Sequence, residues 1–400
     1  MRVDTGRRWL AVGRCVDADP RRAGREAARQ ARVEDDPALL IVFGSGQADP
    51  GAVLAGIGDV FPGVPLIGCS TQAVIASDGL DGPGVAVTAL GGPGFTARTG
   101  LASADGGGQR AAGAAVAECF AGLAGSAGAA DLAGDHPHRV LMLLTDGSLG
   151  DQEEILAGAY SVVGASVPLI GGTCGPDPAF GRGYQLCGRE VATRSVVGAV
   201  IASDAPLGIG LAHGCRKLGE PMIVTRSVQG DIFTLDDQPA LRAYLDRLDA
   251  PPEVYTDAQV FDSWTRPRPI GIRRRNGEEV RHVGMVAGTE GHLRSSGEVP
   301  EGGLIWAMEG DQESILDAAG DACQAAVDDL GGYAPLGLIA FDCISRSKVL
   351  GGEGTRQEVE RMLKVADGAP LAGFYTWGEI ARTRGITGYH NQTLCVLAVA

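Results

Sequence analysis

Val64-Pro-Leu-Ile-Gly-Cys-Ser-Thr71 is the first of three segments in which an apolar run ends in Pro-Leu-x-Gly and then meets small or polar residues. The others are Val167-Pro-Leu-Ile-Gly-Gly-Thr-Cys174 and Ala369-Pro-Leu-Ala-Gly-Phe-Tyr-Thr376. Three copies indicate a repeated unit whose strand ends occupy equivalent places. Open α/β sheets bind their ligands at strand ends.

The same order of elements precedes each copy. A continuously apolar strand and a loop lead into a helical stretch, and the motif strand follows. The predicted strand and helix are 38–43 and 49–60 in the first unit, 139–144 and 152–163 in the second, and 336–341 and 355–365 in the third. Continuous apolar strands are typical of sheets that helices cover on both faces, so each unit is predicted to be βαβ.

The repeat extends outward from each βαβ unit. A strand and a helix come before it, at 9–16 and 20–33, at 95–101 and 108–123, and at 304–308 and 311–330. A further strand comes after it, at 84–90, 196–203 and 393–400. The sequence therefore predicts an α/β protein in which repeated βαβ-type modules form mixed sheets flanked by helices.

Two domains are expected. Residues 1–233 contain two related modules, and residues 234–400 contain the third. A crossing segment near 250–280 is marked by Pro251, Pro252, Pro267 and Pro269, because proline-rich stretches interrupt regular elements.

Composition limits the function. The 400 residues carry a formal net charge of −15, which argues against nucleic acid as a partner. The nine cysteines are scattered without a CxxC pair, which is neither a disulfide framework nor a zinc motif. No run approaches the roughly 20 apolar residues that cross a bilayer, and the first residues lack the apolar stretch of a secretory signal. We therefore expect a cytoplasmic protein, not inserted in a membrane, that meets a soluble molecule.

The third module is richest in polar groups at predicted strand ends. A thiol, a guanidinium, a phenol, a carboxylate, an imidazole and an amide follow its strands, and Arg suits bidentate recognition of a carboxylate or phosphate. The predicted ligand-binding residues are Cys343, Arg346, Tyr375, Glu379, His390 and Asn391. This set is typical of a pocket for an amino-acid-like ligand.

Structural roles remain open for several of these residues. Glu379 can pair with Arg346, and Cys343 can be a small buried hydrophobe. His390 can satisfy a local carbonyl group. Convergence of the side chains in space decides between these alternatives.

A second polar pocket is predicted from the N-terminal half. The turn from Gly171 to Pro176 is rich in glycine but lacks nucleotide-binding spacing, so a tight turn is its other interpretation. The secondary candidates are Asp146, Gly172, Thr173 and His213. The six histidines show no HExxH or His/Cys spacing, so no metal site is predicted.

Several of these motifs, in this order and spacing, resemble those of a known protein family. The N-terminal half is similar to the FIST N domain through Gly68-Cys-Ser-Thr71, Leu143-Leu-Thr-Asp-Gly147, Val167-Pro-Leu-Ile-Gly-Gly172 and Ala212-His-Gly214. The C-terminal part is similar to the FIST C domain through Val299-Pro-Glu-Gly302, Phe341-Asp-Cys-Ile-Ser-Arg346, Gly373-Phe-Tyr-Thr-Trp-Gly-Glu379 and His390-Asn-Gln-Thr393. The chain thus resembles the FIST family of sensory proteins.

The resemblance implies a sensor of a small molecule such as an amino acid. In many relatives the FIST part is fused to an output module; here the three modules account for residues 9–400, so a stand-alone sensor signalling through a separate protein is expected. Some relatives are haem proteins that sense nitric oxide, which keeps a haem sensor as an alternative. No axial haem ligand can be assigned from the sequence.

A third alternative is an enzyme with Cys343 as nucleophile, His390 as base and Glu379 as the orienting group. Asp342 lies beside Cys343 and opposes thiolate formation, so this hypothesis ranks last. No catalytic residue is therefore assigned.

Overall fold

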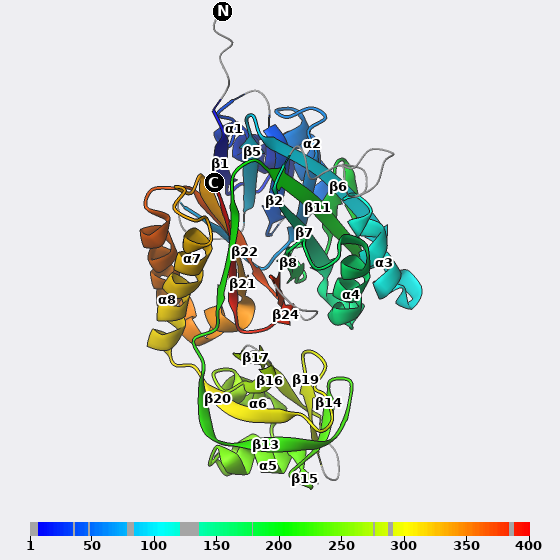
Figure 1. Ribbon diagram of the computed structural model, residues 1–400, viewed down its shortest axis with the longest axis vertical. Helices are drawn as coiled ribbons and strands as arrows, with labels where there is room; N and C mark the ends of the chain where they lie inside the picture. Colours follow the sequence, from blue (N-terminus) through cyan, green and yellow to red (C-terminus); the bar gives the residue numbers. More distant parts are fainter. Residues whose placement is uncertain are drawn as a thin grey trace, which may run out of the picture.

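The structure is a computed structural model that describes residues 7–34, 37–46, 49–77, 84–120, 136–177, 179–274, 277–286, 291–383 and 388–400. Three mixed sheets with outer helices form the larger part of the molecule. A smaller part, built on a fourth sheet, lies below them in the view of Figure 1. Within these residues, no helix is both long and apolar enough to cross a membrane. The α/β class predicted from the sequence is confirmed.

The first sheet contains the first Pro-Leu-x-Gly strand. Its order is β1 (Trp9–Cys15), β5 (Val85–Gly91), β2 (Pro37–Gly44), β3 (Leu66–Ser70), β9 (Gln185–Cys187) and β10 (Glu190–Ala192). β2 and β3 are parallel, as the βαβ unit requires. Helices α1 (Pro20–Gln30) and α2 (Pro50–Gly58) pack on its outer face. Asp49 caps α2 by accepting a hydrogen bond from the Ala52 N–H, ahead of Pro50 in the first turn.

The second sheet repeats this order. It consists of β6 (Phe95–Ser103), β11 (Ser195–Ser203), β7 (His138–Asp146), β8 (Leu169–Cys174), β23 (Glu379–Arg382) and β24 (Tyr389–His390). Helices α3 (Gln109–Ala117) and α4 (Gln152–Val163) cover its outer face. Short 3-10 turns at Asp105–Gly107 and Gly147–Leu149 precede these helices.

The third sheet corrects one prediction. Its order is β12 (Leu207–Ala212), β25 (Leu394–Val399), β21 (Gly337–Cys343), β22 (Leu371–Thr376) and β4 (Val74–Ala76), with α7 (Gln312–Asp328) and α8 (Ile344–Ala366) outside. The strand predicted at 304–308 is present as β20 (Leu304–Glu309), but β20 pairs with strands of another sheet. β12 takes its place, because the chain leaves this module after β12 and returns only at α7.

The excursion forms a fourth sheet, shown in the lower part of Figure 1. Its strands are β17 (Gly277–Arg281), β16 (Ile270–Arg274), β20, β13 (Arg216–Val228), β14 (Asp231–Leu235), β19 (His292–Ser295), β18 (Val283–Val286) and β15 (Gln238–Pro239). Helices α5 (Ala240–Arg247) and α6 (Ala258–Thr265) and the 3-10 turn Pro252–Tyr255 pack with it. We call residues 216–309 the inserted domain. The boundary predicted between residues 233 and 234 lies within β14 and stays a prediction.

The repeated glycine has the same role in all three modules. Each motif glycine lies opposite a residue of the neighbouring parallel strand, so a side chain would strike that strand's backbone. A Cβ atom at Gly68, Gly171 or Gly373 would lie 2.3, 1.9 or 2.1 Å from the carbonyl oxygen of Val42, Leu143 or Ala340, respectively. Close packing of the paired strands therefore explains why Pro-Leu-x-Gly recurs.

Each sheet is completed by a strand from the next module. β9 follows β8 and pairs with β3, β23 follows β22 and pairs with β8, and β4 follows β3 and pairs with β22. All three added strands are antiparallel to the motif strand. We call this arrangement the cyclic strand exchange, and it holds the three motif strands together.

Hydrogen bonds join the three motif strand ends directly. The bonds are Ser70 Oγ to Gly175 O (2.8 Å), Trp377 N to Thr173 O (2.8 Å), Thr173 N to Gly378 O (2.8 Å) and Thr71 Oγ1 to Tyr375 O (2.9 Å). The inner faces of the three sheets share one apolar core, in which the Phe43 and Phe374 rings lie 4.7 Å apart. The strand ends of all three modules therefore meet in one region, which the sequence repeat alone did not predict.

Candidate functional site

A cavity of about 310 Å³ lies beyond the carboxyl ends of β7 and β8. This is the position at which α/β sheets bind ligands, and the volume suits a small molecule. The cavity is lined by Asp146, Gly147, Ser148, Cys174, Pro176, Arg182, Gly183, Thr193, Arg194 and Trp377. We call it the strand-end cavity.

Asp146 ends β7 and is held by three hydrogen bonds. Its Oδ1 accepts from the Ser148 N–H (2.8 Å) and hydroxyl (2.7 Å), and its Oδ2 accepts from the Arg194 N–H (2.9 Å). A carboxylate has about four acceptor positions, so Asp146 can accept one more hydrogen bond. It is 4% exposed, and that exposure opens on the strand-end cavity.

Arg194 adopts a backbone conformation that is rare outside glycine. Its φ is 50°, in the left-handed region, and this conformation directs its N–H at Asp146. Its guanidinium Nε donates to Asp105 Oδ1 at 2.8 Å. Backbone strain of this kind persists where surrounding contacts fix it, and it concentrates at functional sites.

Arg182 and Trp377 complete the cavity wall. The Arg182 side chain is exposed and lies 5.0 Å from the Phe180 ring centroid, and no described carboxylate pairs with it. Trp377 is 45% exposed. A Cβ atom at Gly175 would lie 2.4 Å from Trp377 Nε1, so only glycine lets the indole lie so close to the backbone. The cavity thus combines a carboxylate, two guanidinium groups and an aromatic ring.

Arg346 belongs to a buried ion cluster in the third module. It is 1% exposed, and its guanidinium lies 2.9 Å from Asp342 Oδ1 and 2.6 Å from Glu358 Oε1. It also donates to the Ile315 and His213 carbonyls. Burial, with Glu358 next, raises the pKa of Asp342 well above its usual range. The ion pair that the sequence suggested between Arg346 and Glu379 is formed with these two carboxylates instead.

Glu379 forms a separate cluster beside it. Its carboxyl accepts hydrogen bonds from the Thr376 hydroxyl and, at 3.1 Å, from the Thr393 N–H. The Cys343 thiol is its third partner. Complete burial raises the pKa of Glu379 to about 8, so this group is largely neutral at pH 7.

The structure gives no support to catalysis by Cys343. Burial, with the Glu379 charge next, raises the pKa of its thiol well above the usual value. His390 Nε2 lies 2.9 Å from the Ala381 carbonyl, and burial lowers the pKa of its imidazole. The raised pKa of the thiol disfavours the thiolate that the hypothesis requires, and one ring nitrogen of His390 is engaged by a backbone carbonyl.

The other predicted residues lie near the joined strand ends. Backbone atoms of Tyr375 form hydrogen bonds with residues of the first module. The buried hydroxyl of Tyr375 has no described hydrogen-bond partner. Asn391 Oδ1 accepts from Ser296 of the inserted domain. A Cβ at Gly172 would strike Thr376, and Thr173 Oγ1 accepts from Thr145. His213 Nδ1 accepts from the Cys215 N–H, and burial lowers its pKa.

The candidates thus fall into two groups. Asp146 lines the strand-end cavity, and Thr173 lies one residue before its Cys174 wall. Cys343, Arg346, Tyr375, Glu379 and Asn391 are each at most 3% exposed, and none of them lines the strand-end cavity. Ligand binding by those five residues and His390 stays a prediction.

Sequence reasoning missed Arg182, Arg194 and Arg281. The first two lie on the segment after the glycine-rich turn. This segment runs back to the end of β7, and no local sequence pattern predicts that contact. Arg281 of β17 is fully buried; it donates at 2.8 Å to Glu153 Oε1 on α4 and at 2.8 Å to the Tyr389 carbonyl on β24. It anchors the inserted domain to the second sheet.

No cluster of three His, Cys, Asp or Glu side chains that could hold a metal occurs in the described part of the chain. Among the residues that the structure describes, no histidine lines the strand-end cavity. The walls of this cavity therefore do not supply an imidazole ligand for haem iron.

The fold defines a mixed α/β protein of three related modules with one inserted domain. The sequence profile of the FIST N domain matches residues 38–238 and that of the FIST C domain matches residues 240–382. The chain belongs to the FIST family, whose domains are associated with sensory binding of small ligands.

Related proteins are known from mycobacteria. "Uncharacterized protein Rv0628c" of Mycobacterium tuberculosis is 26% identical over 96% of this chain and 97% of its own length. "Uncharacterized protein Mb0898c" of Mycobacterium bovis is 24% identical over the same shares. A solved cyanuric acid hydrolase from A. caulinodans is 14% identical, covering 49% of this chain and 71% of its own, with a TM-score of 0.26, which is too low to support any argument.

Proposed function

We propose that this protein senses a small zwitterionic metabolite of the amino-acid class, bound in the strand-end cavity. The observation that carries the proposal is the presence of Asp146, Arg182 and Trp377 around one cavity of about 310 Å³ at the ends of β7 and β8. A site for an amino acid needs an acceptor for the ammonium group and a cation for the carboxylate.

The charges of the cavity suit the two ends of an α-amino acid. Asp146 retains an acceptor position for an ammonium group, and its other positions are fixed by the protein. Arg182 has no described carboxylate partner and can bind the ligand carboxylate in a bidentate manner. The Trp377 indole offers an apolar face for the ligand side chain.

The test is isothermal titration of the purified protein with the twenty standard amino acids, one at a time. We expect saturable binding of at least one, with Arg182→Ala weakening it about tenfold or more, since a charge-assisted hydrogen bond contributes about 1.5–3 kcal/mol. Asp146→Asn should weaken it comparably. Arg273→Ala is the matched control, because Arg273 is an exposed arginine of the inserted domain.

The outcomes separate the candidate sites. Binding that survives Arg182→Ala and Asp146→Asn but is lost in Glu379→Gln would move the ligand to the residues of the third module. Absence of binding across the panel would refute an amino-acid sensor. A Soret band after haem reconstitution would favour the haem sensor. The output partner is proposed to be a separate signalling protein.

A further inference from the structure

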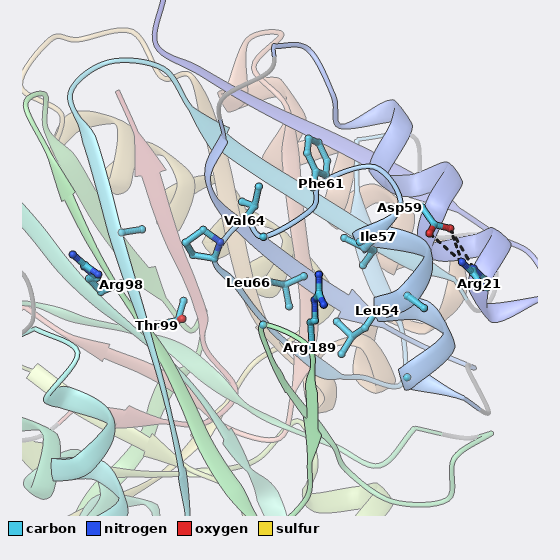
Figure 2. A pocket seen from close by; sticks show the side chains of 17 residues that line it. Arg21, Leu54, Ile57, Asp59, Phe61, Val64, Leu66, Arg98, Thr99 and Arg189 are labelled. Carbon is cyan, nitrogen blue, oxygen red and sulfur yellow. Dashed lines mark hydrogen bonds and ion pairs between the residues drawn. The ribbon is translucent and has the colours of Figure 1, made fainter.

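A second and larger cavity lies at the amino end of the first motif strand, whereas the joined strand ends are carboxyl ends. It is a groove of about 680 Å³ between α2, the segment entering β3, strand β6 and the turn after β9 (Figure 2). We call it the α2–β6 groove. It is open at the surface, and nothing in the proposed sensory function uses it.

The floor of the groove is apolar. Leu54 and Ile57 come from α2, and Phe61, Val64 and Leu66 come from the segment that leads into β3. Figure 2 shows these side chains gathered on one side of the groove. Each of these side chains except the half-buried Val64 has an exposed fraction of 1–7%. The floor is therefore well packed against the protein interior. Such a floor accepts apolar side chains without rearrangement.

One wall of the groove is the edge of a sheet. β6 is the outermost strand of the second sheet and pairs with β11 over its nine residues. Every described backbone bond of residues 95–103 runs to β11. Ala97, Arg98 and Thr99 all line the groove, although successive side chains of a strand point to opposite faces. The groove is therefore bordered by the strand's edge, whose N–H and C=O groups no described strand pairs.

The walls also carry positive charge that no described residue pairs. Arg98 on β6 and Arg189 in the β9–β10 turn are exposed, and no described hydrogen bond or ion pair engages either guanidinium. Arg21, at the far end of the groove, is bound to Asp59 at 3.0 Å. In Figure 2 the Arg189 side chain projects between Leu66 and Leu54. Arg189 lies beside the apolar floor and has no partner among the described residues, which in a chain of net charge −15 favours an anionic apolar occupant.

We infer that the α2–β6 groove binds an extended acidic and apolar segment of a partner protein, which adds as a strand to the edge of β6. The free edge supplies main-chain hydrogen bonds, the floor accepts alternate apolar side chains, and Arg189 pairs with an acidic side chain. A small amphipathic anion would satisfy the arginine and the floor but would leave the strand edge unpaired, so the edge favours a peptide. The three lining residues of β6 span about 10 Å of strand, so the bound segment pairs at least three residues.

The test uses the whole chain and an array of fluorescein-labelled five-residue peptides of Val and Thr, with one Glu placed at each position in turn. Fluorescence anisotropy should show saturable binding of at least one peptide, weakened about tenfold or more by Arg189→Glu, because charge reversal removes an attraction and adds a repulsion. Arg273→Glu, at an exposed arginine of β16, should bind as the wild type. N-methylation of alternate peptide amides should abolish binding if strand addition is correct.

Several results would overturn the inference. Among these are absence of saturable binding across the array, or binding that tolerates both Arg189→Glu and N-methylation. Tight binding of dodecanoate that depends on Arg189, without peptide binding, would assign the groove to a small amphipathic anion. A dimer in sedimentation velocity that Arg189→Glu dissociates would assign it to a second copy of the chain. None of these results bears on amino-acid binding in the strand-end cavity, which is measured separately.

Discussion

Replacing Glu379 by glutamine tests the electrostatics of the joined strand ends. Glu379 is fully buried, and its carboxyl accepts from Thr376 and Thr393 with Cys343 alongside. Burial raises its pKa from 4.5 to about 8, because an ionised carboxylate loses its hydration there. Glutamine has nearly the same shape and carries no charge at any pH.

The size and sign of the effect follow from linkage. The folded protein holds the proton of Glu379 up to a pKa of about 8, whereas the unfolded chain releases it near 4.5. The favourable contribution of the neutral carboxyl is therefore complete below pH 4.5 and is lost as pH rises toward 8. At 1.36 kcal/mol per pKa unit, the loss is on the order of 5 kcal/mol, a large part of the stability of a typical domain.

Urea denaturation followed by circular dichroism, from pH 5 to pH 9, measures this quantity. The free energy of unfolding of Glu379→Gln minus that of the wild type should rise from pH 5 to about pH 8 and level off above it, and other titrating groups cancel in the difference. Glu360→Gln, at an exposed position of α8, should show a flat difference. A flat difference for Glu379→Gln as well would refute a raised pKa at this position.

Other consequences of the structure can be measured independently. Gly171→Ala should destabilise the fold by about 3 kcal/mol or more, because its Cβ would lie 1.9 Å from a backbone oxygen, whereas Gly320→Ala, in open space on α7, should stabilise it by up to about 1 kcal/mol; thermal unfolding compares them. Arg281→Met should cost about 1–3 kcal/mol, because it removes the guanidinium that binds half-buried Glu153 and that shares buried Glu279 with Arg274, and hydrogen exchange should quicken in β17 and β24. Iodoacetamide should label half-buried Cys15 before Cys343, as mass spectrometry will show, and preferential labelling of Cys343 would restore the catalytic hypothesis.

The sequence predicted most of the modular fold because its signals are local. Apolar runs, Asp-Pro helix starts and the Pro-Leu-x-Gly motif each act within a few residues, and Gly68, Gly171 and Gly373 face the same steric requirement. The first strand of the third module was assigned wrongly, since the inserted domain separates β12 from α7 by about a hundred residues. The nearest apolar strand, β20, was taken in its place.

The site was harder to predict because it depends on pairing between distant segments. The motif strand ends pointed to the edge of the sheets where the strand-end cavity lies, and Asp146 was a candidate because it follows a strand. The partners of Arg346 could not be deduced, because Glu358 lies on the far part of α8 and reaches the guanidinium only through the helix packing. Arg182 and Arg194 face Asp146 only after the segment beyond β8 has returned to β7.

The cyclic strand exchange means that the two family domains are not two separate folding units. β4 and β12 belong to the N-terminal half of the chain but lie in the third sheet, and β23 and β24 belong to the C-terminal half but lie in the second sheet. Removing either half would leave an incomplete sheet and would uncover the apolar core that all three sheets share. Trp377, which follows the third motif strand, also forms a wall of the cavity at the end of the second. The strand-end cavity therefore exists only when both halves have folded together, so its shape depends on the contacts between modules.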